Sequence, residues 1–296
     1  MTVLARAAIA TWERPALWIV ALCGFLARGG IVLLALPVAP LPSTVGLATF
    51  VGPTSVTASG LTPDSVVRLV LAIVLAVTWL LAGSAIGALT DVAIVGGLGP
   101  AGHPAAHPVD GRRIVRLVAL RLTALLPLVV VVAITARPVG ELVYHELILP
   151  RDVATPLLLR VVQGAQLQVA AVVLAWIAGE VLGGIAVRLA ILDDRPFFRA
   201  IAGAAVHVTR RPLTTLVTTV AGLVVLVGSV GPALIATGVA WMSLGAVLSG
   251  SVDGSAVVRA TILLVGAWAG CAVLAAMGAA WRGALWTAEV AGAQSA

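Results

Sequence analysis

The sequence predicts an all-α membrane protein, a polytopic transmembrane helical bundle of about six spans. Of its 296 residues, 61% are hydrophobic and only 10% are charged, whereas soluble domains carry roughly 25% charged residues. Six apolar runs are long enough for the roughly 20-residue helix that crosses a bilayer. A single open sheet could not satisfy its edges in lipid, and no run alternates with a period of two. The runs cover residues 16–38, 66–90, 114–136, 161–187, 213–232 and 257–281.

The first run follows Arg6 and Arg14 and could be mistaken for a signal peptide. It extends over residues 16–38, which is longer than a usual apolar signal region of roughly 7–15 residues. We therefore expect an uncleaved first span.

The distribution of arginine predicts the orientation. All 18 basic residues are Arg, and they concentrate before the first span and in the second and fourth connections. The positive-inside rule then places both termini in the cytoplasm. The absence of Lys is typical of a GC-rich genome, and we expect the plasma membrane of a bacterium. Nucleic acid is not an expected partner, because no basic patch is interleaved with aromatic residues.

The fifth run leaves two alternatives open. Apolar sequence continues from 213 to 248 and is interrupted at Gly231-Pro232. Either one span ends there and an outer interfacial segment follows, or residues 233–249 form a seventh span and the C-terminus lies outside.

A recurrence of about 97 residues favours one span there. Arg14, Arg113 and Arg211 are spaced 99 and 98 residues apart, and the return runs share a Val pair beside Arg and a later Trp. We predict three tandem helical hairpins with short interfacial helices in the outer connections. Any six-span topology could also repeat such features. The hairpins would occupy about 12–95, 112–190 and 210–290 of a single domain, 1–296.

Two charged residues interrupt predicted spans. Arg28 lies about 21 Å along a helix from Arg14, where an isolated guanidinium is costly and needs protein or water around it. Glu180 lies at a similar depth, counted from Asp193. We predict a buried Arg28–Glu180 ion pair that acts as a packing staple. The alternatives are a gating or proton-linked role and no contact between the two residues.

Further charged residues lie near the predicted inner ends of the spans. Solvated helix ends explain them most simply, and a network at the inner leaflet is the alternative. These residues are Asp91, Arg121, Arg282 and Glu289.

Motifs for catalysis and cofactors are absent from the sequence. It contains no HExxH, GxSxG or GxxxxGK[ST] pattern, so no enzyme, cofactor or metal is expected. His103 and His107 precede Asp110, but each His is followed by Pro, which makes this segment a linker rather than a helical metal site.

Residues 188–212 form a basic amphipathic segment that we expect along the inner leaflet. Its arginines alternate with apolar residues such as Leu189 and Phe197, a pattern that favours anionic lipid headgroups. The predicted headgroup contacts are Arg188, Arg195, Arg199, Arg210 and Arg211.

The order Asp-Asp-Arg-Pro-Phe-Phe-Arg-Ala at 193–200, followed by Arg-Arg-Pro-Leu at 210–213, resembles a group of bacterial six-span membrane proteins. These are similar to the membrane domain of glycerophosphodiester phosphodiesterases. The resemblance implies a six-span fold in the region of the fourth and fifth spans. This chain has no room for the phosphodiesterase barrel and none of its metal ligands, so no functional residue is carried over.

These observations favour a non-enzymatic integral membrane protein, either an accessory or scaffold subunit or a lipid-interacting protein. Its expected partners are anionic inner-leaflet lipids and an unidentified membrane protein. The alternative is a small transporter with a polar path lined by Arg28 and Glu180.

Overall fold

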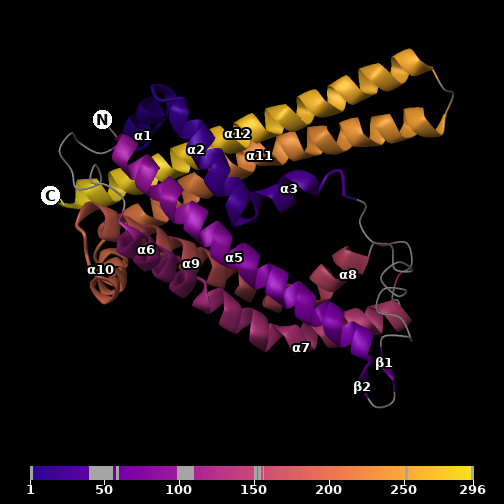
Figure 1. Cartoon of the computed structure of the whole chain (residues 1–296), viewed down its shortest axis with the longest axis horizontal. Coiled ribbons are helices and arrows are strands. Elements are labelled where there is room, and N and C mark those ends of the chain that lie inside the picture. Colours follow the sequence, from indigo (N-terminus) through magenta and orange to yellow (C-terminus); the bar gives the residue numbers. More distant parts are fainter. Residues whose placement is uncertain are drawn as a thin grey trace. The chain divides into compact units, whose positions relative to one another are not determined.

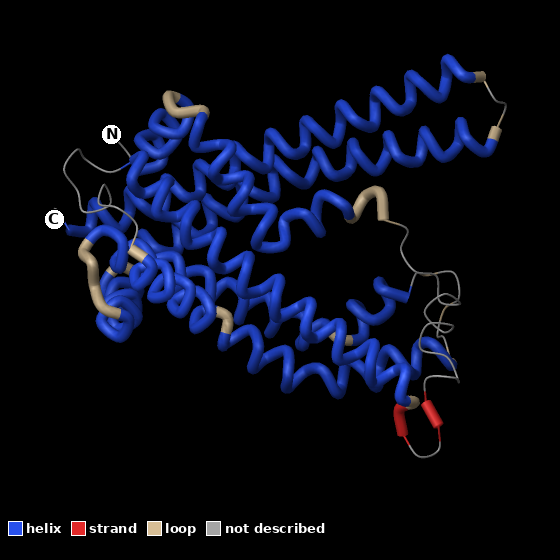
Figure 2. Tube along the Cα trace, in the orientation of Figure 1, coloured by secondary structure: helices blue, strands red, loops and turns tan. Residues whose placement is uncertain are grey.

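The computed structural model describes residues 3–39, 56–57, 60–98, 110–149, 152, 155, 157–250 and 253–294. Figure 2 shows these residues as helix nearly throughout. Six helical stretches are long and apolar enough to cross a membrane, which confirms the predicted all-α membrane fold. They are Ala16–Ala35, Val66–Leu98, Gly111–Leu147, Gln166–Leu192, Pro212–Ser249 and Gly254–Gly292.

The first half of the chain is built from short and long helices. Its helices are α1 (Val3–Trp12), α2 (Ala16–Phe25), the π-helical turn η1 (Leu26–Gly30), α3 (Ile31–Ala35), α5 (Pro63–Leu98), α6 (Gly111–Ala124) and α7 (Leu126–Ile148). Two residue pairs, β1 (Val56–Thr57) and β2 (Gly60–Leu61), pair antiparallel. Most of the first outer connection, where we predicted an interfacial helix, lies outside the described residues.

The second half contains the longest helices. They follow as α8 (Leu157–Gly164), α9 (Gln166–Leu192), α10 (Phe197–Arg210), α11 (Pro212–Ser249) and α12 (Gly254–Gln294). The fifth span is a single 38-residue helix that continues through Pro232. The helix therefore forms neither the outer interfacial segment nor the separate seventh span that the sequence allowed after Pro232. A proline inside a helix removes one hydrogen-bond donor, and here the helix continues on both sides of it. Helices α11 and α12 pack along each other (Figure 1).

Contacts divide the chain into two compact units. The first, which we call the arginine-rich unit, comprises Met1–Ala39, Leu80–Arg121 and Val181–Ala296. The second unit comprises Pro40–Trp79 and Leu122–Glu180. The largest buried apolar cluster belongs to the arginine-rich unit, where Ile185, Leu117 and Trp286 pack together from three helices. Within this unit, α1 and α2 also pack against α12.

Two helices carry charge-free intervals of the same length. On α5 the interval runs from Arg68 to Asp91, and on α12 it runs from Arg259 to Arg282. Each corresponds to about 34 Å of helix, close to the ~30 Å hydrocarbon core of a bilayer. We therefore expect the hydrocarbon to end near Asp91 and Arg282. Both helices continue past these residues, to Leu98 and Gln294.

The first and third spans are both broken, and each break has a physical cause. In η1, Gly29 has a φ of 101°, a conformation that only glycine adopts freely. Between α6 and α7, Leu125 has a φ of −82° and a ψ of −13°. Pro127 follows, and its ring excludes the hydrogen bond of a continuous helix.

At each break, the preceding carbonyl lies against a glycine of the following span. A Cβ added at Gly83 would overlap the oxygen of Ala27, and a Cβ added at Gly179 would overlap that of Ala124. The two carbonyls are 97 residues apart and the two glycines are 96 residues apart. Gly270, the corresponding position of the third hairpin, faces open space. The threefold repeat stays a prediction, and these contacts support its first two members.

We expect Gly83→Ala and Gly179→Ala to lower the stability of the protein in detergent by about 1–3 kcal/mol each, because the added methyl group must displace a backbone carbonyl. Gly270→Ala is the matched control, since it makes the same chemical change where there is room. Thermal unfolding of the three purified variants measures the effect. Equal midpoints for Gly83→Ala and Gly270→Ala would contradict the close helix contact.

Candidate functional site

A buried carboxylate on α5 joins three elements of the arginine-rich unit. The Asp91 side chain is only 3% exposed. Arg121 of α6 donates to its Oδ2 from both Nε, at 2.9 Å, and Nη2. Arg28 of η1 places its Nη2 3.6 Å from Oδ1. We call these three residues the Asp91 cluster. It shows that Asp91 and Arg121 form a network of ion pairs rather than solvated helix ends.

The side chain of Arg28 also forms hydrogen bonds that stabilise the break in the first span. Its Nε donates to the carbonyl of Gly24 at 3.0 Å, and its Nη2 donates to Thr90 Oγ1 at 3.4 Å. The first bond satisfies an acceptor beside the distorted turn, and the second ties that turn to α5. A side chain at position 24 would overlap Thr90 Oγ1, so glycine is required for this approach.

Arg28 and its predicted partner Glu180 belong to different units. Within the arginine-rich unit, Arg28 faces the carboxylate of Asp91. Glu180 lies half-buried on α9, at the end of the second unit. The pairing of Arg28 with Glu180 therefore stays a prediction.

The predicted lipid contact of Arg188 is wrong, because its side chain is buried. It is 4% exposed, and it donates to the carbonyls of Gly184 at 2.9 Å and Gly283 at 3.2 Å. Among the described residues, its buried Nε has no hydrogen-bond partner, and the guanidinium interacts electrostatically with Asp91. A guanidinium enclosed by α9 and α12 cannot contact headgroups, so Arg188 belongs to the interior.

A second buried carboxylate fixes α10 to the two long helices. Glu289 of α12 is 6% exposed. Its Oε1 accepts a hydrogen bond from Thr215 of α11 at 3.2 Å and lies 3.4 Å from Nε2 of His207 of α10. The sequence offered little indication of this site, because Glu289 follows Thr215 by 74 residues.

The second unit contains a buried ion pair of its own. Arg160 of α8 and Glu146 of α7 are 8% and 2% exposed, with Nε 3.5 Å from Oε2. Arg160 also donates to the backbone carbonyl of Asp152. The pair thus holds the short helix α8 against α7. The pattern of charges along one helix could not predict it, because its two residues belong to different helices.

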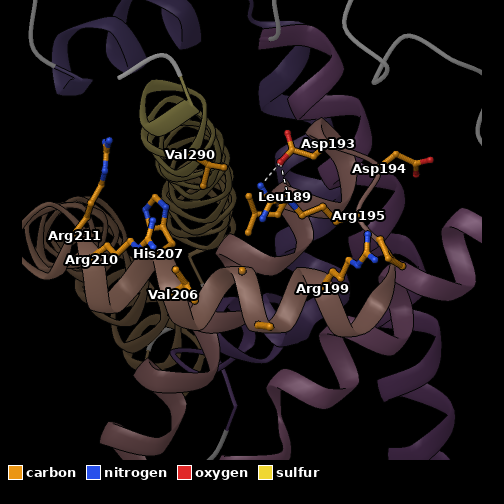
Figure 3. A pocket seen from close by; sticks show the side chains of 13 residues that line it. Leu189, Asp193, Asp194, Arg195, Arg199, Val206, His207, Arg210, Arg211 and Val290 are labelled. Carbon is orange, nitrogen blue, oxygen red and sulfur yellow. Dashed lines mark hydrogen bonds and ion pairs between the residues drawn. The ribbon is translucent and has the colours of Figure 1, made fainter.

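The remaining predicted lipid contacts surround α10. This helix buries Ala200 and Ala204 against the core, while Phe198 is 81% exposed on the opposite side. Along it lies a hollow of about 830 Å³ (Figure 3). The structure brings together four of the five predicted residues in the lining of this hollow: Arg195, Arg199, Arg210 and Arg211.

A sharp turn separates α10 from α9. Asp194 has a φ of 50°, in the left-handed region that Asp tolerates better than most residues. Its carboxylate pairs with Arg116, and the hydrogen bond from that guanidinium lowers the pKa of Asp194 below its usual value of 3.8. Asp193 pairs with Arg195 at 2.7 Å. These pairs orient the start of α10.

Among the described residues, no group of three His, Cys, Asp or Glu side chains could hold a metal ion. His103 and His107, which we assigned to a linker, lie outside those residues. No family model, curated protein or solved structure matches the chain. The resemblance to six-span bacterial membrane proteins stays a prediction.

We expect Asp91→Asn to destabilise the detergent-solubilised protein by about 3–5 kcal/mol, because it removes the buried carboxylate that pairs with the part-buried Arg121 guanidinium. Thermal unfolding measures the loss, and Glu13→Gln, at an exposed site of the same unit, is the control. Asp91→Asn combined with Arg121→Gln should cost less than the sum of the single changes. Strict additivity would show that the two side chains are not coupled.

Proposed function

We propose that this integral membrane protein is a non-enzymatic accessory or scaffold protein of a bacterial plasma membrane that binds anionic lipid headgroups at its cytoplasmic surface. The observation that carries the proposal is the surface of α10. There, four arginines line one hollow, and Phe198 is 81% exposed beside Arg199.

The position of α10 in the chain supports contact with the membrane surface. It follows the end of α9 at Leu192 and precedes the start of α11 at Pro212, so both of its ends adjoin candidate spans. Val290, which lines the hollow, comes about 12 Å along α12 beyond Arg282. The hollow is therefore past the charge-free interval, on the polar side of the expected hydrocarbon boundary.

The contacts of Arg28 support a packing role within this proposal. The guanidinium is engaged by Gly24, Thr90 and Asp91, all on neighbouring helical segments. An arginine held in this way stabilises a helix break and a helix interface. The transporter alternative would instead need Arg28 to exchange these contacts for a substrate during each cycle.

Anionic phosphatidylglycerol added to the purified protein should raise its unfolding temperature more than zwitterionic phosphatidylcholine does. Each surface arginine near anionic lipid contributes about 1 kcal/mol, roughly fivefold in affinity, and added salt should weaken it. The double variant Arg199→Ala with Arg210→Ala should lose most of the effect.

The matched control for this experiment is Arg14→Ala with Arg112→Ala. It removes the same charge from exposed sites of the arginine-rich unit outside the hollow. If both double variants lose the lipid-dependent stabilisation equally, the effect depends on net charge and not on the hollow. Equal stabilisation by the two lipids would reject the proposed function.

The proposed sidedness predicts a labelling pattern in intact cells. In a chain with Cys23 and Cys271 replaced by Ala, a Cys at exposed Ser249 should react with a membrane-impermeant maleimide added outside the cell. A Cys at exposed Thr209 on α10 should react only after lysis. The reverse pattern would place α10 outside the cell and overturn the assignment.

A further inference from the structure

The hollow beside α10 has two basic ends on the same helix face. Arg199 and Arg210 are eleven residues apart, which is about three whole turns, or 16 Å along the axis. Both are exposed and both line the hollow. Within the described part of the chain, neither side chain makes a hydrogen bond or an ion pair. Both guanidinium groups are thus available to a ligand.

Between these ends the hollow is lined by Ala202, Gly203 and Val206 and by His207, whose Nε2 faces Oε1 of Glu289 at 3.4 Å. Arg195 lies over Gly203, where an added Cβ would come within 2.7 Å of its Nη1. Its charge is balanced by Asp193, whose Oδ2 lies 2.7 Å from Nη2 (Figure 3). The hollow therefore presents positive charge, then a neutral middle, then positive charge again.

From this charge pattern we infer that the hollow binds one lipid that carries two phosphate groups on a short polar linker, with Arg199 contacting one phosphate and Arg210 the other. The inference rests on the proposed function and names the lipid class. Arginine is suited to the task because its planar fork binds phosphate in a bidentate manner. The long apolar stems allow the two guanidinium groups to turn toward each other over the neutral middle.

A ligand with a single phosphate contacts both ends only when both side chains extend fully toward each other along the roughly 16 Å between the two positions. When two phosphates are joined, the second contact forms within the same molecule, and its effective concentration reaches the millimolar range for a short linker. Phe198, next to Arg199, adds an apolar surface that suits acyl chains and offers nothing to a soluble bisphosphate. The geometry therefore favours the lipid over its free headgroup.

The test compares three probes on the full-length protein in neutral detergent. They are cardiolipin, which has two phosphates per molecule, phosphatidylglycerol at equal total phosphate, and the deacylated cardiolipin headgroup. Dissociation constants come from lipid-dependent unfolding shifts. We expect cardiolipin to bind at least tenfold more tightly than phosphatidylglycerol, and the deacylated headgroup to bind weakly.

The variants locate the two contacts. Arg199→Ala and Arg210→Ala should each weaken cardiolipin binding about fivefold or more and bring it close to phosphatidylglycerol binding. Arg14→Ala should preserve the preference for cardiolipin, as should Arg112→Ala. Circular dichroism before lipid addition checks that each variant is folded. Because both substituted arginines are exposed, their replacement should leave the fold intact.

The outcomes separate the inference from the proposed function. Equal affinity for cardiolipin and phosphatidylglycerol per phosphate overturns the two-ended site but leaves anionic lipid binding intact. Binding of the deacylated headgroup as tightly as cardiolipin assigns the site to a soluble bisphosphate and overturns the lipid class. If no anionic lipid binds better than phosphatidylcholine, the proposed function fails together with the inference.

Discussion

The arginine-rich unit depends on one buried carboxylate. Asp91 accepts hydrogen bonds from Arg121 and faces Arg28, so it connects the first, second and third spans at one point. Burying ionised groups is costly, and such a cluster is stable only if geometry and hydrogen bonding compensate for lost hydration. Here the same guanidinium that faces Asp91 also satisfies the carbonyl of Gly24. The helix break and the ion pair thus stabilise each other.

Close backbone contacts supply the rest of the packing between these spans. In lipid, apolar side chains gain little by leaving their solvent, so helix association depends on small residues and polar contacts. Gly24 and Gly83 allow α2 and η1 to approach α5 closely, and Gly179 plays a similar part in the second unit. Gly83 and Gly179 are 96 residues apart, close to the period of the predicted repeat.

Hydropathy was sufficient to predict the six spans, because the requirement for a long apolar helix is a property of local sequence. It could not predict whether the apolar segment after Pro232 bends away, since that depends on packing along α12. Asp91 resembled a solvated helix end because its partners come from other helices. Arg188 was misassigned because the amphipathic pattern of 188–212 was treated as continuous. The chain turns at Asp194, whose φ is 50°, so Arg188 belongs to a different, buried helix.

The order of the Asp91 cluster along the chain has a consequence for biosynthesis. Asp91 follows Arg28 by 63 residues, and Arg121 follows Asp91 by 30. At roughly 5–20 residues per second, the ribosome needs about 3–13 s after adding Arg28 before Asp91 exists. During that time the local bond to Gly24 is available, but the carboxylate is not. The nascent first span therefore carries a guanidinium without the Asp91 carboxylate until the second span has been synthesised.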